Sequence, residues 1–192
     1  MPTVVLPARP ERSAGSHEGR AYTSLRDVRG LRRYNTGIVA IYHLSAKPIS
    51  RATGRSATGA AAYRSGERIT DERTGLTFDY GKKSGVDHTE IICPANAPAW
   101  LTDLSRGQLW NLVEATEKRK DAQVCREVEV ALPVELSFEQ QRELVRGFVK
   151  EQFAQRGMVA DLAMHHTTGH APHCHILLTM RDIDRQGFGQ KN

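Results

Sequence analysis

Two apolar segments near the C-terminus, 158–166 and 173–180, constrain the fold more than any other feature of this chain. Each has the length of a strand, and only a short connection that contains Gly and Thr separates them. Two such segments joined so closely predict an antiparallel hairpin. The run Ile176, Leu177 and Leu178 lacks polar alternation, so the second strand is expected to be buried in a sheet.

Histidines gather on this predicted hairpin. His173 and His175 are two residues apart, and side chains at that spacing point to the same face of a strand. Either His165 or His166, in the preceding strand, adds a third imidazole to that face. Three neutral imidazoles are typical of a catalytic metal centre with open coordination positions. The alternative is a group of hydrogen-bonded core histidines.

The composition agrees with a cytoplasmic protein that binds nucleic acid. The 192 residues carry a net charge of +5, with a pI of about 9.3. The three cysteines are scattered, which indicates reduced thiols, and neither a signal peptide pattern nor a run long enough to span a membrane is present. A basic segment could contact phosphates or form a solvent-exposed basic helix; its candidate DNA-binding residues are Lys47, Arg51, Arg55 and Arg64.

The order of predicted elements indicates an α+β fold with a central antiparallel sheet and helices on one face. Strands are predicted at 38–44, 76–80, 88–93 and 123–132, and helices at 60–69, 105–120 and 137–156. The segment 47–59 is predicted to be a loop, and no closing element is predicted to follow the polar tail 185–192. Residues 1–37 have no apolar period, so we expect a disordered or poorly ordered leader before a domain at 38–192.

Two further groups suggest phosphodiester chemistry. Tyr63 lies among small residues and next to an arginine, where it could act as a covalent nucleophile; Tyr34, Tyr42 and Tyr80 compete for that role, and core packing is the alternative. Glu127 and Glu129 share one face of a predicted strand. A carboxylate there could accept the second N–H of a metal-bound His, or form an acidic edge facing solvent.

Four ordered blocks carry a resemblance to a known family. They are AIYHLSAK at 40–47, AYR at 62–64, REVEVALP at 126–133 and PHCH at 172–175. Together they resemble the MobA/MobL family of conjugative relaxases, which belongs to the endonucleases with a His-hydrophobic-His motif. The resemblance implies a five-stranded antiparallel sheet with flanking helices, a divalent metal ion (Mg²⁺ or Mn²⁺) on three histidines, and a tyrosine that nicks one DNA strand at an origin of transfer.

The family's roles fall on particular residues of this sequence. The nucleophile falls on Tyr63, the paired ligands on His173 and His175, and the third ligand on His165, with His166 left open. The acidic residue falls on Glu127 or Glu129. The resemblance implies a 5′-phosphotyrosine intermediate, single-stranded DNA at an origin of transfer, accessory mobilisation proteins and a type IV secretion coupling protein in the bacterial cytoplasm. A rolling-circle replication initiator and a non-catalytic DNA-binding module are the alternatives.

The chain departs from the family pattern at its two ends. Family members usually begin with Met just before the first block, where this chain has Val39 preceded by 38 residues. A GTG codon read as Met at Val39 would make it the true start, so we expect the leader to be dispensable. Family domains also continue beyond Asn192, and we therefore expect this chain to be the front part of a longer protein.

Overall fold

A five-stranded antiparallel sheet forms the centre of the domain. The computed structural model describes residues 43–166 and 171–191. The strands follow the order β1-β5-β7-β6-β4, and every neighbouring pair is antiparallel. Their bounds are β1 Leu44–Ser50, β4 Val86–Ile92, β5 Gln123–Ala131, β6 Ala160–His165 and β7 His173–Thr179. The predicted hairpin is β6 and β7, and the α+β class is confirmed.

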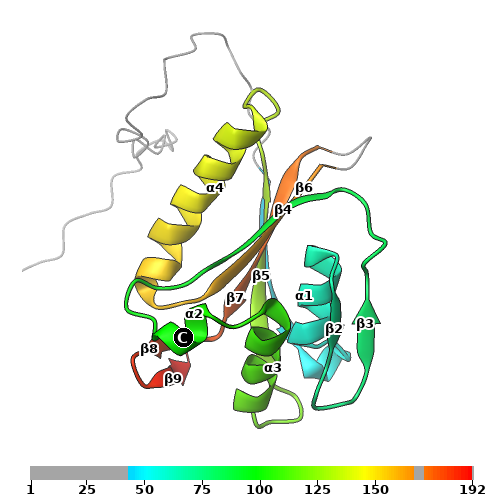
Figure 1. Cartoon of the computed structure of the whole chain (residues 1–192), viewed down its shortest axis with the longest axis vertical. Helices are drawn as coiled ribbons and strands as arrows, with labels where there is room; N and C mark the ends of the chain where they lie inside the picture. The colour runs from blue at the N-terminus through cyan, green and yellow to red at the C-terminus, as the bar shows by residue number, and fades with distance from the viewer. Residues whose placement is uncertain (1–42, 167–170, 192) are drawn as a thin grey trace, which may run out of the picture. The chain divides into compact units, whose positions relative to one another are not determined.

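Helices cover both faces of this sheet. Helices α1 (Ala57–Ser65) and α3 (Arg106–Thr116) pack in one core with Leu177, whereas α4 (Phe138–Gln152) packs in a second core with Ile176 and Leu178 (Figure 1). The expectation of helices on a single face is therefore wrong. The physical reason is that β7 is apolar on both of its faces, so each face needs a covering layer.

Shorter elements complete the described chain. They are η1 (Arg51–Thr53), the hairpin of β2 (Arg68–Thr70) and β3 (Thr77–Asp79), α2 (Ala99–Thr102), η2 (Ala154–Arg156), and the hairpin of β8 (Arg181–Asp184) and β9 (Gly187–Lys191). The predicted polar tail 185–192 thus contains β9, the second strand of the last hairpin. None of the helices in 43–166 and 171–191 combines the length and the apolar character of a membrane span.

The N-terminal half shows where local patterns mislead. The predicted leader and most of the predicted strand 38–44 lie outside the described residues. The segment 47–59, predicted as a loop, holds the end of β1, the turn η1 and the start of α1. Strand β1 is a polar strand at the sheet edge, where Pro48 is tolerated because one side needs no ladder hydrogen bond. The predicted helix 60–69 begins earlier and ends at Gly66, which has a φ of 69°.

A buried ion pair anchors the start of α1. The Arg51 guanidinium donates to Glu114 at 2.9 Å and 2.5 Å, and also to the main-chain oxygens of Glu117 and Arg119. The other Glu114 oxygen accepts the main-chain N–H of Ala57 at 2.6 Å. Arg51 was predicted to contact DNA, but its side chain is only 7% exposed. The guanidinium is held by hydrogen bonds at the end of α3, which leaves little of this side chain for a phosphate contact.

Removing the Glu114 carboxylate should destabilise the domain strongly. Glu114→Ala leaves the Arg51 guanidinium buried without its counter-charge, so we expect a loss of about 3 kcal/mol in the free energy of unfolding. Urea denaturation measures it. Asp121→Ala is the matched control, since it removes the carboxylate of the exposed Arg119–Asp121 pair and should change stability little. Equal midpoints for the two variants would contradict the anchoring role.

Candidate metal centre and nucleophile

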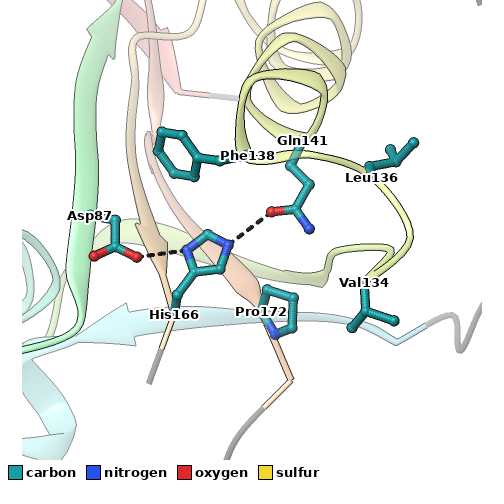
Figure 2. Close-up of a pocket in the computed structure, with 7 residues that line it drawn as sticks. All are labelled: Asp87, Val134, Leu136, Phe138, Gln141, His166 and Pro172. Carbon is teal, nitrogen blue, oxygen red and sulfur yellow. Dashed lines mark hydrogen bonds and ion pairs between the residues drawn. The ribbon is translucent and has the colours of Figure 1, made fainter. Parts of the chain in front are cut away.

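Adjacent histidines at the end of β6 lie on opposite sides of the sheet. His165 pairs with His173 in the β6–β7 register. His166 instead enters a pocket of about 600 Å³, where its Nδ1 lies 2.9 Å from Asp87 and its Nε2 lies 2.8 Å from Gln141 (Figure 2). The pocket is completed by Val134, Leu136, Phe138 and Pro172. The geometry therefore separates the two candidates for the third ligand.

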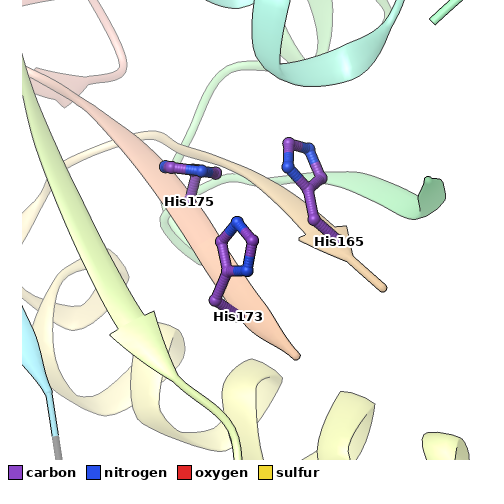
Figure 3. Close-up of side chains that lie close together, drawn as sticks. All are labelled: His165, His173 and His175. Atoms are coloured by element: carbon purple, nitrogen blue, oxygen red, sulfur yellow. The ribbon is translucent and has the colours of Figure 1, made fainter. Parts of the chain in front are cut away.

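Three histidines converge on the other face. His165 from β6 meets His173 and His175 from β7, with ring centroids 5.0–5.3 Å apart (Figure 3). One potential ligand nitrogen from each ring lies within 4.8 Å of the others. The intervening Cys174 is buried in the opposite core, as the strand period predicts. This arrangement brings together the histidines expected from the sequence.

Each ring has an oxygen beside one nitrogen. His165 Nε2 donates to the Arg64 carbonyl at 2.7 Å, and His173 Nδ1 donates to the Ala171 carbonyl at 3.0 Å. His175 Nδ1 faces Glu127 Oε1 at 3.1 Å. Within 43–166 and 171–191, the other nitrogen of each ring makes no hydrogen bond and could serve as a ligand atom. Metal-binding histidines have this pattern, because the outer oxygen fixes the ring and its tautomer.

Burial keeps two of these rings uncharged. It lowers the pKa of His165 to about 4, against the Arg64 hydrogen bond, which raises it. Burial also lowers the pKa of His175, against the opposing influence of Glu127. Both rings are therefore neutral at physiological pH, and the neutral form is the one that binds a metal ion. The donor set thus fits a divalent transition metal.

The buried Glu127 carboxylate lies next to His175 and is surrounded by three cationic side chains. It is fully buried, accepts from Arg64 Nε, and lies 3.4 Å from Lys47 Nζ and 3.9 Å from Arg55. Burial alone would raise the pKa of Glu127, but His175, Arg64 and Lys47 outweigh it and hold the pKa well below its ordinary range. This carboxylate is therefore ionised.

Glu129 and Glu127 differ in their distance from His175. Glu129 Oε2 is 3.9 Å from His175 Nδ1, and its side chain is 30% exposed. Glu127 is both nearer and buried. Of the two acidic residues left open by the sequence, Glu127 is therefore the one placed to orient His175.

Tyr63 lies in the last turn of α1 beside this cluster. Its side chain is 44% exposed, and the carbonyl of the next residue, Arg64, accepts the hydrogen bond from His165. Tyr80 packs against Tyr63 at a centroid distance of 5.1 Å, in a T-shaped geometry. Of the other tyrosines considered, Tyr34 and Tyr42 lie outside the described residues. An accessible phenol is thus placed on a helix end that contacts the histidine cluster.

Sequence reasoning missed Lys83. Its ammonium donates to the Tyr63 carbonyl at 2.6 Å and lies 3.9 Å from the centroid of the Tyr63 ring. Burial, and then the charge of Arg64, lower the pKa of Lys83 to about 8. Lys83 lies in a polar turn after β3, where nothing in the local pattern distinguishes it from Lys82.

Three of the four predicted DNA-binding residues surround Glu127. The side chains of Lys47 and Arg55 are 47% and 40% exposed, whereas that of Arg64 is 12% exposed. Their three positive charges exceed the two negative charges of Glu127 and the nearby Glu129. This part of the surface therefore attracts anions.

Residues 55–192 match the model of the MobA/MobL family. The chain belongs to this family. It is 54% identical over 127 residues to "Mobilization protein MobL" of Acidithiobacillus ferridurans, covering 66% of the chain, and 43% identical over 161 residues to "Conjugal transfer protein TraA" of Rhizobium radiobacter, covering 80%. The MobA/MobL chain spans 32% and 14% of the lengths of these two relatives.

A solved structure resembles this MobA/MobL domain throughout most of its length. The structure is titled "Molecular Basis of Vancomycin Resistance Transfer in Staphylococcus aureus". It aligns with a TM-score of 0.73 and 37% sequence identity, covering 80% of this chain and 77% of the solved chain. The likeness extends the family assignment to the three-dimensional fold.

The two adjacent histidines should respond differently to substitution. His165→Ala removes one potential ligand from the cluster, so we expect Mn²⁺ to bind about a hundredfold more weakly or worse. This loss of affinity should be at least as large as the loss caused by removing the hydrogen-bond partner of a metal-binding histidine. His166→Ala, the control on the opposite face, should bind Mn²⁺ like the parent chain. Isothermal titration calorimetry measures both. Normal binding by His165→Ala together with loss in His166→Ala would contradict this ligand set.

Proposed function

We propose that this domain nicks and rejoins one strand of DNA at a plasmid origin of transfer, with Tyr63 as the nucleophile. The observation that carries the proposal is the hydrogen bond from His165 to the Arg64 carbonyl. This hydrogen bond connects Arg64, the residue after the exposed Tyr63, to the cluster of three histidines. A nucleophile and a metal centre that act on one phosphate require such a fixed relation.

The proposed reaction is a transesterification. The Tyr63 oxygen attacks the scissile phosphorus, the bond from phosphorus to the 3′-oxygen breaks, and the proton lost by the phenol is balanced by one gained at the 3′-oxygen. The products are a 5′-phosphotyrosine and a free 3′-hydroxyl. Since one phosphoester replaces another, a second 3′-hydroxyl can reverse the step and rejoin a strand.

His165, His173 and His175 would hold a divalent ion, which when bound supplies positive charge that polarises the phosphate. Glu127 orients the His175 ring and fixes Arg64 at the same time. Imidazole nitrogens are ligands of transition ions, while Mg²⁺ prefers oxygen, so of the two ions expected from the family Mn²⁺ fits this donor set better.

The partners follow from the proposed reaction. Lys47 and Arg55, the exposed cations around one buried carboxylate, would contact the phosphates of single-stranded DNA, with the less exposed Arg64 beside them. The names of the relatives refer to mobilisation and conjugal transfer. We propose that the protein works in the bacterial cytoplasm, with accessory mobilisation proteins and a type IV secretion coupling protein as its partners.

Tyr63→Phe should abolish covalent attachment to DNA. Single-stranded oligonucleotides covering the transfer origin are incubated with the chain and Mn²⁺, and the adduct is resolved on a denaturing gel. The variant should keep its DNA affinity in fluorescence anisotropy, because only a hydroxyl is lost. Tyr80→Phe is the control and should still form the adduct. An adduct at the parent level in Tyr63→Phe would refute the assignment, and binding without any adduct in the parent chain would favour an accessory DNA-binding module.

DNA affinity should depend on salt through Lys47 and Arg55. Replacing either by Gln removes a phosphate contact, so the slope of log K against log salt concentration should become shallower by about 0.7 for a single strand. The loss should be similar for unrelated sequences, because phosphate contacts carry little sequence information. Arg119→Gln, at an exposed position paired with Asp121, serves as the control. Unchanged slopes in both test variants would rule out this surface.

A further inference from the structure

The turn between β3 and β4 is held against the C-terminal end of α1. Gly66, which ends the helix, has a φ of 69°, and a Cβ built there would lie 3.5 Å from Val86 and 3.7 Å from the Tyr80 carbonyl. Within the turn, the Lys83 N–H donates to that same Tyr80 carbonyl at 2.8 Å. The Tyr80 N–H in turn donates to the carbonyl of Glu67, the residue after Gly66, at 3.2 Å, so main-chain hydrogen bonds link Lys83 to the helix end.

The Lys83 ammonium makes two contacts with one residue. It donates to the Tyr63 carbonyl at 2.6 Å and lies 3.9 Å from the centroid of the Tyr63 ring. The carbonyl belongs to the last turn of α1, where the helix dipole favours a cation. The ring distance is within the range of a cation–π interaction. The Lys83 ammonium therefore contacts the ring and the main-chain carbonyl of Tyr63 at the same time, which restrains the ring relative to the helix.

The ring needs such a restraint because much of its surface is open. Tyr63 is 44% exposed, and its ring contacts in the described chain are Lys83, Arg64 at 4.8 Å and Tyr80 at 5.1 Å. Arg64 is already engaged by Glu127. Among residues 43–166 and 171–191, no carboxylate forms an ion pair with Lys83. Its charge is thus left to act on Tyr63.

We propose that Lys83 is a positioning residue that holds the Tyr63 ring in its attacking orientation. The inference rests on the proposed role of Tyr63 as the nucleophile. The half-buried ammonium, with Arg64 nearby and without a paired carboxylate, is in an unfavourable setting for a purely structural lysine. Its pKa of about 8 still leaves it charged at neutral pH. The same charge would favour the phenol oxygen as it becomes anionic during attack.

The kinetic test separates orientation from folding and from DNA binding. Lys83→Met removes the charge and keeps the length of the side chain, Lys83→Arg keeps the charge, and Lys82→Met is the control at the exposed neighbouring position. At saturating DNA and Mn²⁺, we expect Lys83→Met to form the adduct about tenfold more slowly or worse, with Lys83→Arg recovering most of the rate and Lys82→Met unchanged. Thermal melting and fluorescence anisotropy are measured for every variant.

A spectroscopic test checks the geometry without using activity. The Lys83 ε-methylene protons should be shifted upfield in NMR spectra by the Tyr63 ring current, and Tyr63→Leu should remove that shift while Tyr80→Leu leaves most of it. An unchanged adduct rate in Lys83→Met, or a rate lost equally in Lys83→Met and Lys83→Arg together with lower melting temperatures, would overturn the inference. A rate defect that disappears at saturating DNA would make Lys83 a DNA ligand instead. Failure of the parent chain to form an adduct would overturn the proposed function, and this inference with it.

Discussion

A single buried carboxylate links the parts of the site. Glu127 lies on β5, faces His175 on β7, accepts from Arg64 on α1, and lies near Lys47 on β1. A lone carboxylate at this depth would be costly, and so would an isolated guanidinium. Each is stable only while the other is in place. The sheet, the helix that carries Tyr63 and the orientation of one histidine are therefore interdependent, and the site forms as one electrostatic unit.

The strand period divides the sheet between two tasks. On β7 the residues facing α4 are Cys174, Ile176 and Leu178, all buried in an aliphatic core, while His173 and His175 face the side of α1. The face toward α4 thus supplies packing alone, whereas the other face combines the histidines with Leu177, which is buried in the core with α1 and α3. The aliphatic face can hold the backbone of the hairpin rigid without any polar group, and this rigidity places the histidines with respect to one another.

The sequence predicted those features that depend on local period. The hairpin, the histidine pair and the start of the helix predicted at 137–156 could all be predicted, because each depends on residues close together in the chain. The sequence did not decide whether His165 or His166 is the third ligand. The two are neighbours in one strand and point to opposite faces of the sheet, so a register error of one residue exchanges them. The sequence also could not show that Arg51 is buried and Arg55 exposed, because it is the packing of α3 that buries Arg51. Strand β1 lacked both alternation and apolar content, and Lys83 lay in a turn whose contact with α1 is tertiary.

The link between α1 and His165 uses a main-chain oxygen, not the side chain of Arg64. Natural substitution at position 64 would therefore leave this acceptor in place, whereas insertion or deletion of one residue within α1 would carry it around the helix axis by about 100°. The position of this acceptor therefore restricts the length of the helix, whereas the buried Glu127 separately restricts the side chain at position 64. The small residues Ala60, Ala61 and Ala62 are all buried in the core that this helix shares with the sheet, so a shift of the helix along its axis would also move them out of their packing positions.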